Sequence, residues 1–210
     1  MDTTIGFPNH AGTLLVLGLA AGVLSCLAYL PYIRDTVKGQ TQPQRASWLI
    51  WSVLGSISLV SQIYEGATSS LWFAGVQVTG TIVVFVLSVR SGLGKYLHKT
   101  DYAILVTAAF GLLLWLFTEN VVYALAISIG ISLLGGAVTV LKAYRNPDSE
   151  TLSTWSISLI ASICAVLSVG RMDWILLAYP LYLFTLYTAF VIAIVAGRTR
   201  EHGVLLELKS

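Results

Sequence analysis

Residues 174–196 read WILLAYPLYLFTLYTAFVIAIVA and contain no charged side chain. At 1.5 Å per residue, a helix of this length crosses the ~30 Å hydrocarbon core of a bilayer. Further apolar stretches of the same kind precede it, at 13–33, 47–64, 71–89, 102–117, 121–141 and 152–169. The sequence therefore predicts an all-α integral membrane protein with seven transmembrane helices, the fourth being the shortest.

The composition is typical of a membrane protein and not of a soluble domain. The chain of 210 residues is 56% hydrophobic and 10% charged, with a mean hydropathy of +0.81, whereas soluble domains carry about 25% charged residues. The loops between the stretches are too short to form a soluble domain, so the expected surroundings are a lipid bilayer and not a nucleic acid. Cys26 and Cys164 lie inside apolar stretches, and the three histidines lack metal-ligand spacing. Neither a metal, a cofactor nor an enzymatic activity is expected.

The basic residues predict the orientation in the membrane. All but one of the 12 lysines and arginines lie in alternate loops or after the last stretch; Arg171 alone lies on the other side. Lysine and arginine are retained in the cytoplasm during insertion, so the N-terminus is expected outside and the C-terminus inside. The very short loops and the absence of a targeting signal favour a bacterial cytoplasmic (inner) membrane.

Four tryptophans indicate an internal repeat. Trp48 and Trp155 each begin an apolar stretch after a basic loop, and Trp72 and Trp174 begin the following stretches after a short acidic turn. The first three stretches then correspond to the last three, and the fourth joins them. We expect an extracytoplasmic tail at 1–12, two parallel three-helix bundles at 13–94 and 121–197, a linker helix at 95–120 and a cytoplasmic tail at 198–210. Transporters with such repeats place the substrate site between them.

The loop after the first stretch resembles a known family. It reads Leu30-Pro31-Tyr32-Ile33-Arg34-Asp35 and continues to Ser47-Trp48. With the 3+1+3 order, this resembles the SWEET / PQ-loop transporter superfamily, whose signature is Pro-Gln at the end of the first helix; here Tyr32 replaces the glutamine. The resemblance implies a carrier of a small solute, with hinges at helix prolines and paired polar residues on the third and seventh helices holding the substrate.

The polar residues inside the apolar stretches are the candidate site. No Asp, Glu, Lys, Arg or His lies in the middle of any stretch, which argues against a proton relay and favours a neutral or zwitterionic solute. Helical spacing places Trp51 and Ser58 on one face of the second helix and Ser158 and Ser162 on the equivalent face of the sixth. Close helix packing is the alternative explanation for the serines. Trp48 and Trp155 are expected at the membrane interface as anchors.

Gln77 and Tyr179 form a second candidate pair, because each lies five residues after a tryptophan that begins its stretch. We expect them to face each other and to bind substrate, although Gln77 could instead pair structurally with Thr81 or a neighbouring helix. Pro31 and Pro180 are candidate hinges of a gate, or static kinks. The Gly18 and Gly22 pair predicts close helix packing, either within the first bundle or between protomers. A homo-oligomer is therefore one of the two arrangements that the sequence allows.

These observations predict a facilitative carrier of a small neutral or zwitterionic, sugar-like metabolite. The sequence leaves two alternative functions open. The first is a vitamin or nucleoside carrier resembling the nicotinamide riboside transporters, and the second is a non-transporting membrane receptor or assembly protein.

Overall fold

The computed structural model describes residues 10–90 and 121–207, with 102, 103, 106, 109, 113 and 117 between them. The predicted linker at 95–120, including the fourth apolar stretch, therefore lies mostly outside the described residues. The described part of the chain contains no β-strand. Its elements are α1 (His10–Val37), α2 (Arg45–Tyr64), α3 (Leu71–Arg90), α5 (Val121–Arg145), the short 3₁₀ helix η1 (Pro147–Ser149), α6 (Leu152–Ser168) and α7 (Trp174–Glu207).

Most of these helices have the length and apolar character of membrane spans. Five of them, α1, α2, α3, α5 and α7, contain a stretch long and apolar enough to cross a bilayer. The helix α6 is equally apolar but has 17 residues. The expectation of an all-helical chain built from membrane-length helices is confirmed to this extent.

Several helices run past the predicted stretches, and α1 and α7 do so by the most residues. Helix α1 begins before and ends after the expected 13–33, and α7 continues to Glu207 through most of the predicted tail at 198–210. Arg198 and Arg200 lie in this extension and are exposed. Arginine and glutamate are good helix formers, so the helix need not end where its apolar stretch ends.

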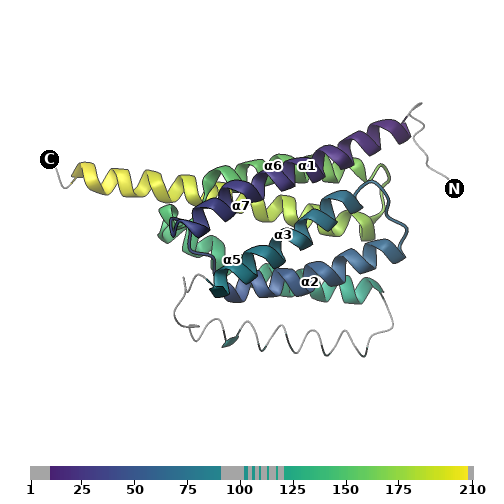
Figure 1. The fold of residues 1–210 in the computed structure, drawn as a ribbon, viewed down its shortest axis with the longest axis horizontal. Coiled ribbons are helices and arrows are strands. Elements are labelled where there is room, and N and C mark those ends of the chain that lie inside the picture. Colours follow the sequence, from purple (N-terminus) through teal and green to yellow (C-terminus); the bar gives the residue numbers. More distant parts are fainter. Residues whose placement is uncertain are drawn as a thin grey trace.

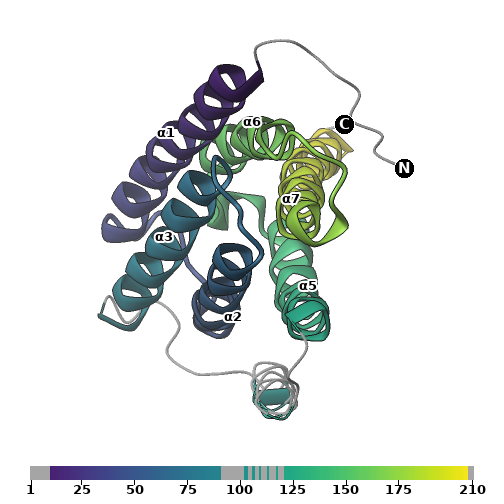
Figure 2. The ribbon, with the colours of Figure 1, turned by 90° about the vertical axis from the view of Figure 1, so that its right-hand side faces the viewer.

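The helices form a ring around a common centre (Figures 1 and 2). Helix α3 packs between α1 and α2, and α7 packs between α5 and α6. The ring is completed by contacts of α1 with α6 and of α2 with α5. Figure 2 shows α1, α3 and α2 along one side of the ring and α6, α7 and α5 along the other.

Small and hydroxyl side chains allow α2 and α5 to approach closely. Ser47 donates to the carbonyl of Gly135 at 3.1 Å, and Thr139 donates to the Ser47 hydroxyl at 2.8 Å. Such interhelical hydrogen bonds, together with residues that lack bulky side chains, stabilise helix pairs in an apolar environment, where burial of apolar surface adds little.

The two longer loops meet at one end of the ring. The backbone N–H of Gln42, between α1 and α2, donates to the carbonyl of Ser149, between α5 and α6, at 3.2 Å. We call this the basic end, because Arg34, Lys38 and Arg145 lie there. The turns between α2 and α3 and between α6 and α7 lie at the other end, which we call the opposite end.

Gly18 allows α1 to pack closely against the turn between α2 and α3, at the opposite end. A Cβ atom at this position would overlap the backbone carbonyl of Ser69, and one at Gly22 would touch Trp72. The predicted close packing at these two glycines therefore occurs within the chain.

We expect Gly18→Ala to lower the free energy of unfolding by about 1–3 kcal/mol, because the methyl group forces α1 away from a backbone that cannot yield. The measurement is the apparent melting temperature of purified protein in detergent. Gly12→Ala, on the same helix and with no atom near the added methyl, is the matched control and should be neutral or slightly stabilising. Equal melting temperatures for the two variants would contradict this packing.

Candidate functional site

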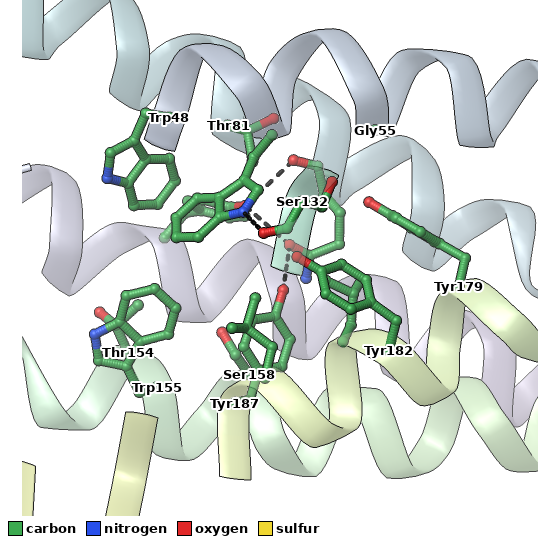
Figure 3. Close-up of a pocket in the computed structure, with 15 residues that line it drawn as sticks. Trp48, Gly55, Thr81, Ser132, Thr154, Trp155, Ser158, Tyr179, Tyr182 and Tyr187 are labelled. Atoms are coloured by element: carbon green, nitrogen blue, oxygen red, sulfur yellow. Dashed lines mark hydrogen bonds between the residues drawn. The ribbon is translucent and has the colours of Figure 1, made fainter. Parts of the chain in front are cut away.

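A small cavity lies at the centre of the ring, and all six of the long helices in the described part of the chain contribute to it (Figure 3). Its volume is about 30 Å³, which is room for about two water molecules. The lining is aromatic and uncharged, and consists of Tyr29, Trp48, Trp51, Gly55, Gln77, Thr81, Ser132, Thr154, Trp155, Ser158, Tyr179, Tyr182, Leu183, Leu186 and Tyr187. It therefore combines several flat ring faces with a limited set of neutral hydrogen-bonding groups.

Gln77 is the most extensively bonded of these groups. Its Oε1 accepts hydrogen bonds from the hydroxyls of Tyr29 and Tyr187, both at 2.9 Å, and its Nε2 donates to Ser25 at 3.1 Å. The side chain is 2% exposed. An unpaired amide in such a place costs several kcal/mol, so these bonds hold α1, α3 and α7 together. The amide pairs with neighbouring helices and not with Thr81, which donates to the carbonyl of Val78.

Tyr179 reaches the same cavity but has a different neighbour. Its hydroxyl lies against α2, where a Cβ atom on Gly55 would be 3.3 Å away (Figure 3). The tyrosine that bonds Gln77 is Tyr187, two turns further along α7. The expected helices thus meet across the cavity, with Tyr187 in place of Tyr179 as the partner of the amide.

The other four predicted site residues separate into two groups. Trp51 and Ser158 line the cavity, and Trp51 Nε1 donates to the carbonyl of Ser132 at 3.3 Å. Ser58 and Ser162 are buried one to two turns closer to the opposite end and are not among the lining residues. The Ser162 hydroxyl donates to the carbonyl of Leu159 at 2.7 Å, which is the ordinary behaviour of a packed helical serine.

Three lining residues carry a buried polar atom without a hydrogen-bond partner in the described part of the chain: Trp48 Nε1, Thr154 Oγ1 and Tyr182 Oη. The Tyr182 hydroxyl points toward Ser132 in the middle of the cavity (Figure 3). It also lies near Trp51, yet neither neighbour has the geometry of a hydrogen bond with it. Native proteins rarely leave such groups unpaired, so these atoms are the ones with free capacity to bind a solute.

The sequence pointed to Tyr179 and, as a weaker candidate, to Tyr182, but not to Tyr187 or Tyr29. Tyr182 and Tyr187 fall on the same face of α7 as Tyr179, at spacings of three and five residues with Leu183 and Leu186 between them. This helical periodicity was visible in the sequence, but it does not distinguish a face that lines a cavity from one that faces lipid. Tyr29, on α1, carried no comparable signal.

The expected interfacial role of Trp48 and Trp155 is wrong. Both indoles are 3% exposed and lie inside the ring, between the cavity and the basic end. Trp155 stacks on Phe190 with ring centroids 3.7 Å apart and planes 4° apart, and Trp48 lies 6.4 Å from Trp155. Because helices α2 and α6 begin within the bundle, their first turns point inward and form an aromatic layer in place of anchors.

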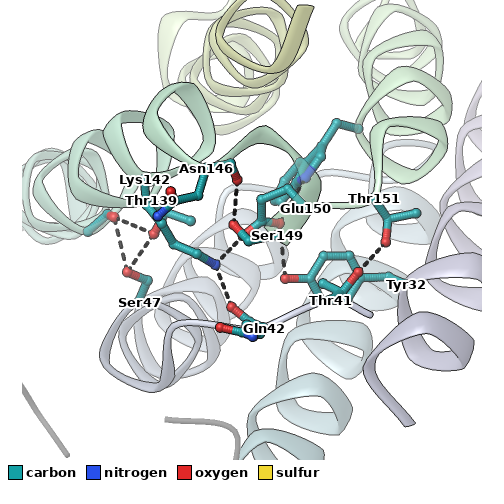
Figure 4. A network of polar contacts seen from close by, with 12 residues as sticks. Tyr32, Thr41, Gln42, Ser47, Thr139, Lys142, Asn146, Ser149, Glu150 and Thr151 are labelled. Atoms are coloured by element: carbon teal, nitrogen blue, oxygen red, sulfur yellow. Dashed lines mark hydrogen bonds and ion pairs between the residues drawn. The ribbon is translucent and has the colours of Figure 1, made fainter. Parts of the chain in front are cut away.

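A polar network covers this aromatic layer at the basic end (Figure 4). The Glu150 carboxylate, 3% exposed, pairs with Lys142 at 2.8 Å and accepts hydrogen bonds from Tyr32 and Trp155, both at 3.2 Å. Lys142 also donates to the carbonyl of Gln42. One buried charge is therefore bonded to α1, α5 and α6, and its partner Lys142 reaches the loop between α1 and α2.

A second contact joins the same two loops. The hydroxyls of Thr41 and Thr151 are 2.5 Å apart, and Thr151 donates to Asp35 at 3.0 Å. The cavity is thus closed at the basic end by an aromatic layer and then by a layer of hydrogen bonds.

The two candidate hinge prolines both lie inside helices. Pro31 is in α1, one residue before Tyr32, and Pro180 is buried in α7, one residue after Tyr179. Each removes one backbone donor from its helix beside a residue of the cavity or of the polar network.

The fold and the cavity together define an all-helical, membrane-type protein with an uncharged aromatic cavity inside its helix ring. No family profile, curated protein or solved structure matches this chain.

We expect Glu150→Ala to lower the free energy of unfolding by about 3 kcal/mol, because it leaves Lys142 beside buried groups without its counter-charge. The measurement is a double-mutant cycle of Glu150→Ala and Lys142→Ala, by denaturant-induced unfolding in detergent. The two changes should be strongly non-additive.

Asp148→Asn provides the control from the same loop. Asp148 is 85% exposed at its side chain and lies 3.6 Å from Arg198, so its loss should cost less than about 1 kcal/mol. A Glu150→Ala variant no less stable than Asp148→Asn would show that the buried pair does not hold the loops together.

Proposed function

We propose that this chain is a membrane carrier that moves a small neutral or zwitterionic metabolite by alternating access between two three-helix units. The observation that carries the proposal is the central cavity, which is lined by all six of the long helices that the structure describes. It holds polar atoms between aromatic rings, and these atoms have no hydrogen-bond partner among the described residues. A site between two halves of a bundle, away from either end, is the arrangement that alternating access requires.

The pattern of helix contacts supports two equivalent units. In one, α3 packs between α1 and α2; in the other, α7 packs between α5 and α6. If α1, α2 and α3 correspond to α5, α6 and α7, the contact of α1 with α6 also has its counterpart in the contact of α5 with α2. Each principal helix–helix contact of one unit then has an equivalent contact in the other unit. The proposed seven-span, 3+1+3 plan, with its linker at 95–120, predicts this correspondence.

The size of the cavity supports a closed state of such a carrier. Ligand pockets occupy about 300–1,000 Å³, whereas this cavity has about 30 Å³. A metabolite could enter only after the two units separate. Toward the basic end, this movement must part Trp48 from Trp155 and break the Thr41–Thr151 contact. Pro31 and Pro180 are the proposed hinges, since each interrupts the hydrogen bonding of a helix that borders the cavity.

The chemistry of the lining favours an uncharged solute with a flat face. Trp51, Trp48 and Trp155 offer rings for stacking, and Tyr182, Ser158 and Gln77 offer neutral donors and acceptors. A sugar-like solute fits this set, and a nucleoside or vitamin of the nicotinamide riboside type fits it as an alternative. A receptor for a charged peptide would place basic residues in the cavity, and none of the described lining residues is basic.

The charge distribution supports an inner-membrane orientation with the N-terminus outside. The two loops that meet at the basic end, together with the helix ends beside them, carry Arg34, Lys38, Arg45, Lys142 and Arg145. Under the positive-inside rule, this end is the cytoplasmic face.

The first experiment is a thermal-shift screen of purified protein against sugars, amino acids, nucleosides and B vitamins. A ligand of the folded state raises the apparent melting temperature. Silence across the panel from folded, monodisperse protein would favour a receptor or assembly role.

The sharper test uses Tyr182→Phe, which removes an unpaired hydroxyl and no hydrogen bond of the described protein. Without ligand, this variant should be as stable as the wild type or more stable, because an unsatisfied buried polar group costs about 1–3 kcal/mol. With ligand, Kd should rise about tenfold, the equivalent of one lost hydrogen bond.

Tyr123→Phe, at an exposed position of α5, is the matched control and should bind as the wild type does. An unchanged Kd in Tyr182→Phe would remove the cavity centre as the binding site. Proteoliposome uptake of the same ligand then separates a carrier from a receptor.

A further inference from the structure

A second and much larger cavity runs along the outside of the ring between α1 and α3, which lie side by side in Figure 2. We call it the α1–α3 groove and define it by Cys26, Leu30 and Ile33 on α1 and by Trp72, Gly75 and Val83 on α3. Its volume is about 810 Å³. From Trp72 to Val83 it extends about 16 Å along α3, at 1.5 Å per residue, which is about half of the ~30 Å hydrocarbon core.

The groove is apolar and results from a missing side chain. Leu30 and Trp72 are exposed, and no atom lies within 4 Å of the position that a Cβ on Gly75 would take. The hydroxyl of Thr79, which also lines the groove, donates to the carbonyl of Gly75 at 2.9 Å and so satisfies itself within α3. The groove therefore offers contact to hydrocarbon and no hydrogen-bonding groups of the kind that select a polar solute.

Two arginines lie on the groove face at the basic end. Arg34 is one turn beyond Leu30, and Arg90 is two turns beyond Val83, so helical periodicity places both in line with the groove. Both are exposed, and neither has an ion-pair partner among the residues that the structure describes. The other end of the groove, at Thr68 and Trp72, has no basic residue in its lining.

We propose that the α1–α3 groove binds one anionic phospholipid, whose acyl chain lies along Ile33, Gly75 and Trp72 and whose phosphate lies between Arg34 and Arg90. Guanidinium groups bind phosphate by charge-assisted hydrogen bonds, and basic clusters at the membrane surface select anionic lipids. The position of the arginines places the headgroup in the leaflet of the basic end. This inference does not depend on whether the central cavity transports a solute.

The groove shares one wall with the central cavity. Tyr29 lines both, and its ring lies over Gly80 of α3 while its hydroxyl bonds Gln77. An acyl chain in the groove therefore contacts the back of a residue that borders the candidate site.

The test measures binding of phosphatidylglycerol and of phosphatidylcholine with identical acyl chains to the full chain in detergent, by native mass spectrometry and by thermal shift. The wild type should bind phosphatidylglycerol about thirtyfold more tightly, on the scale expected for two basic residues at an anionic headgroup. Glycerol phosphate without acyl chains should produce no shift.

Two variants separate the headgroup from the chain. Arg34→Gln combined with Arg90→Gln should abolish the preference for phosphatidylglycerol, while Arg145→Gln, an exposed arginine at the same end on α5, should retain it. Gly75→Leu adds a side chain to the groove at a position where a Cβ atom meets no other atom within 4 Å, and it should weaken the binding of both lipids equally. Gly130→Leu, an equally open glycine on α5, is its control and should bind both lipids as the wild type does.

Equal binding of the two lipids by the wild type would overturn the proposal, as would a preference that survives loss of both arginines. A wild type that is dimeric and becomes monomeric in Gly75→Leu, with lipid binding unchanged, would also overturn it, because a second copy would then occupy the groove.

Discussion

An amide buried in an apolar bundle costs several kcal/mol unless its polar atoms are hydrogen-bonded. Gln77 is such an amide, so the arrangement of three helices depends on the hydrogen bonds that its side chain makes. The amide is bonded to Tyr29 and Ser25 of α1 and to Tyr187 of α7. Apolar contacts between helices are weakly directional in such surroundings, because lipid offers similar ones. The few polar bonds therefore determine how α1, α3 and α7 are rotated and spaced, and through them which side chains face the central cavity.

At the basic end, the buried polar group that must be paired is a carboxylate. Glu150 is buried and has Lys142, Tyr32 and Trp155 as partners, so the two long loops are joined through side chains from α1, α5 and α6. Any movement that opens the cavity toward this end must compensate those bonds with water. In the proposed carrier, these hydrogen bonds would stabilise the closed state, and the open state would exchange them for hydration.

Periodicity along single helices explains what could be foreseen of the candidate site. Trp51 and Ser158 were expected on inward faces and line the cavity, because residues three and four apart share a face in any helix. Ser58 and Ser162 share those faces but lie past the end of the cavity, since periodicity gives the face and not the depth. Trp48 and Trp155 were assigned to the membrane interface from their position in the chain, yet the helices around them bury both indoles.

The sequence by itself determined that the chain is helical and membrane-like, because long apolar stretches can satisfy their backbone in hydrocarbon only as helices or closed barrels, and these have the length of helical spans. It also determined which residue types are available inside the ring, namely aromatic rings, hydroxyls and amides, without charges in the middle of the spans. Only the tertiary structure decided that Tyr187 pairs with Gln77, that the Tyr182 hydroxyl has no partner among the described residues, and that Glu150 is buried. These outcomes depend on the rotation and depth of one helix against another, which are set by contacts between residues far apart in the chain.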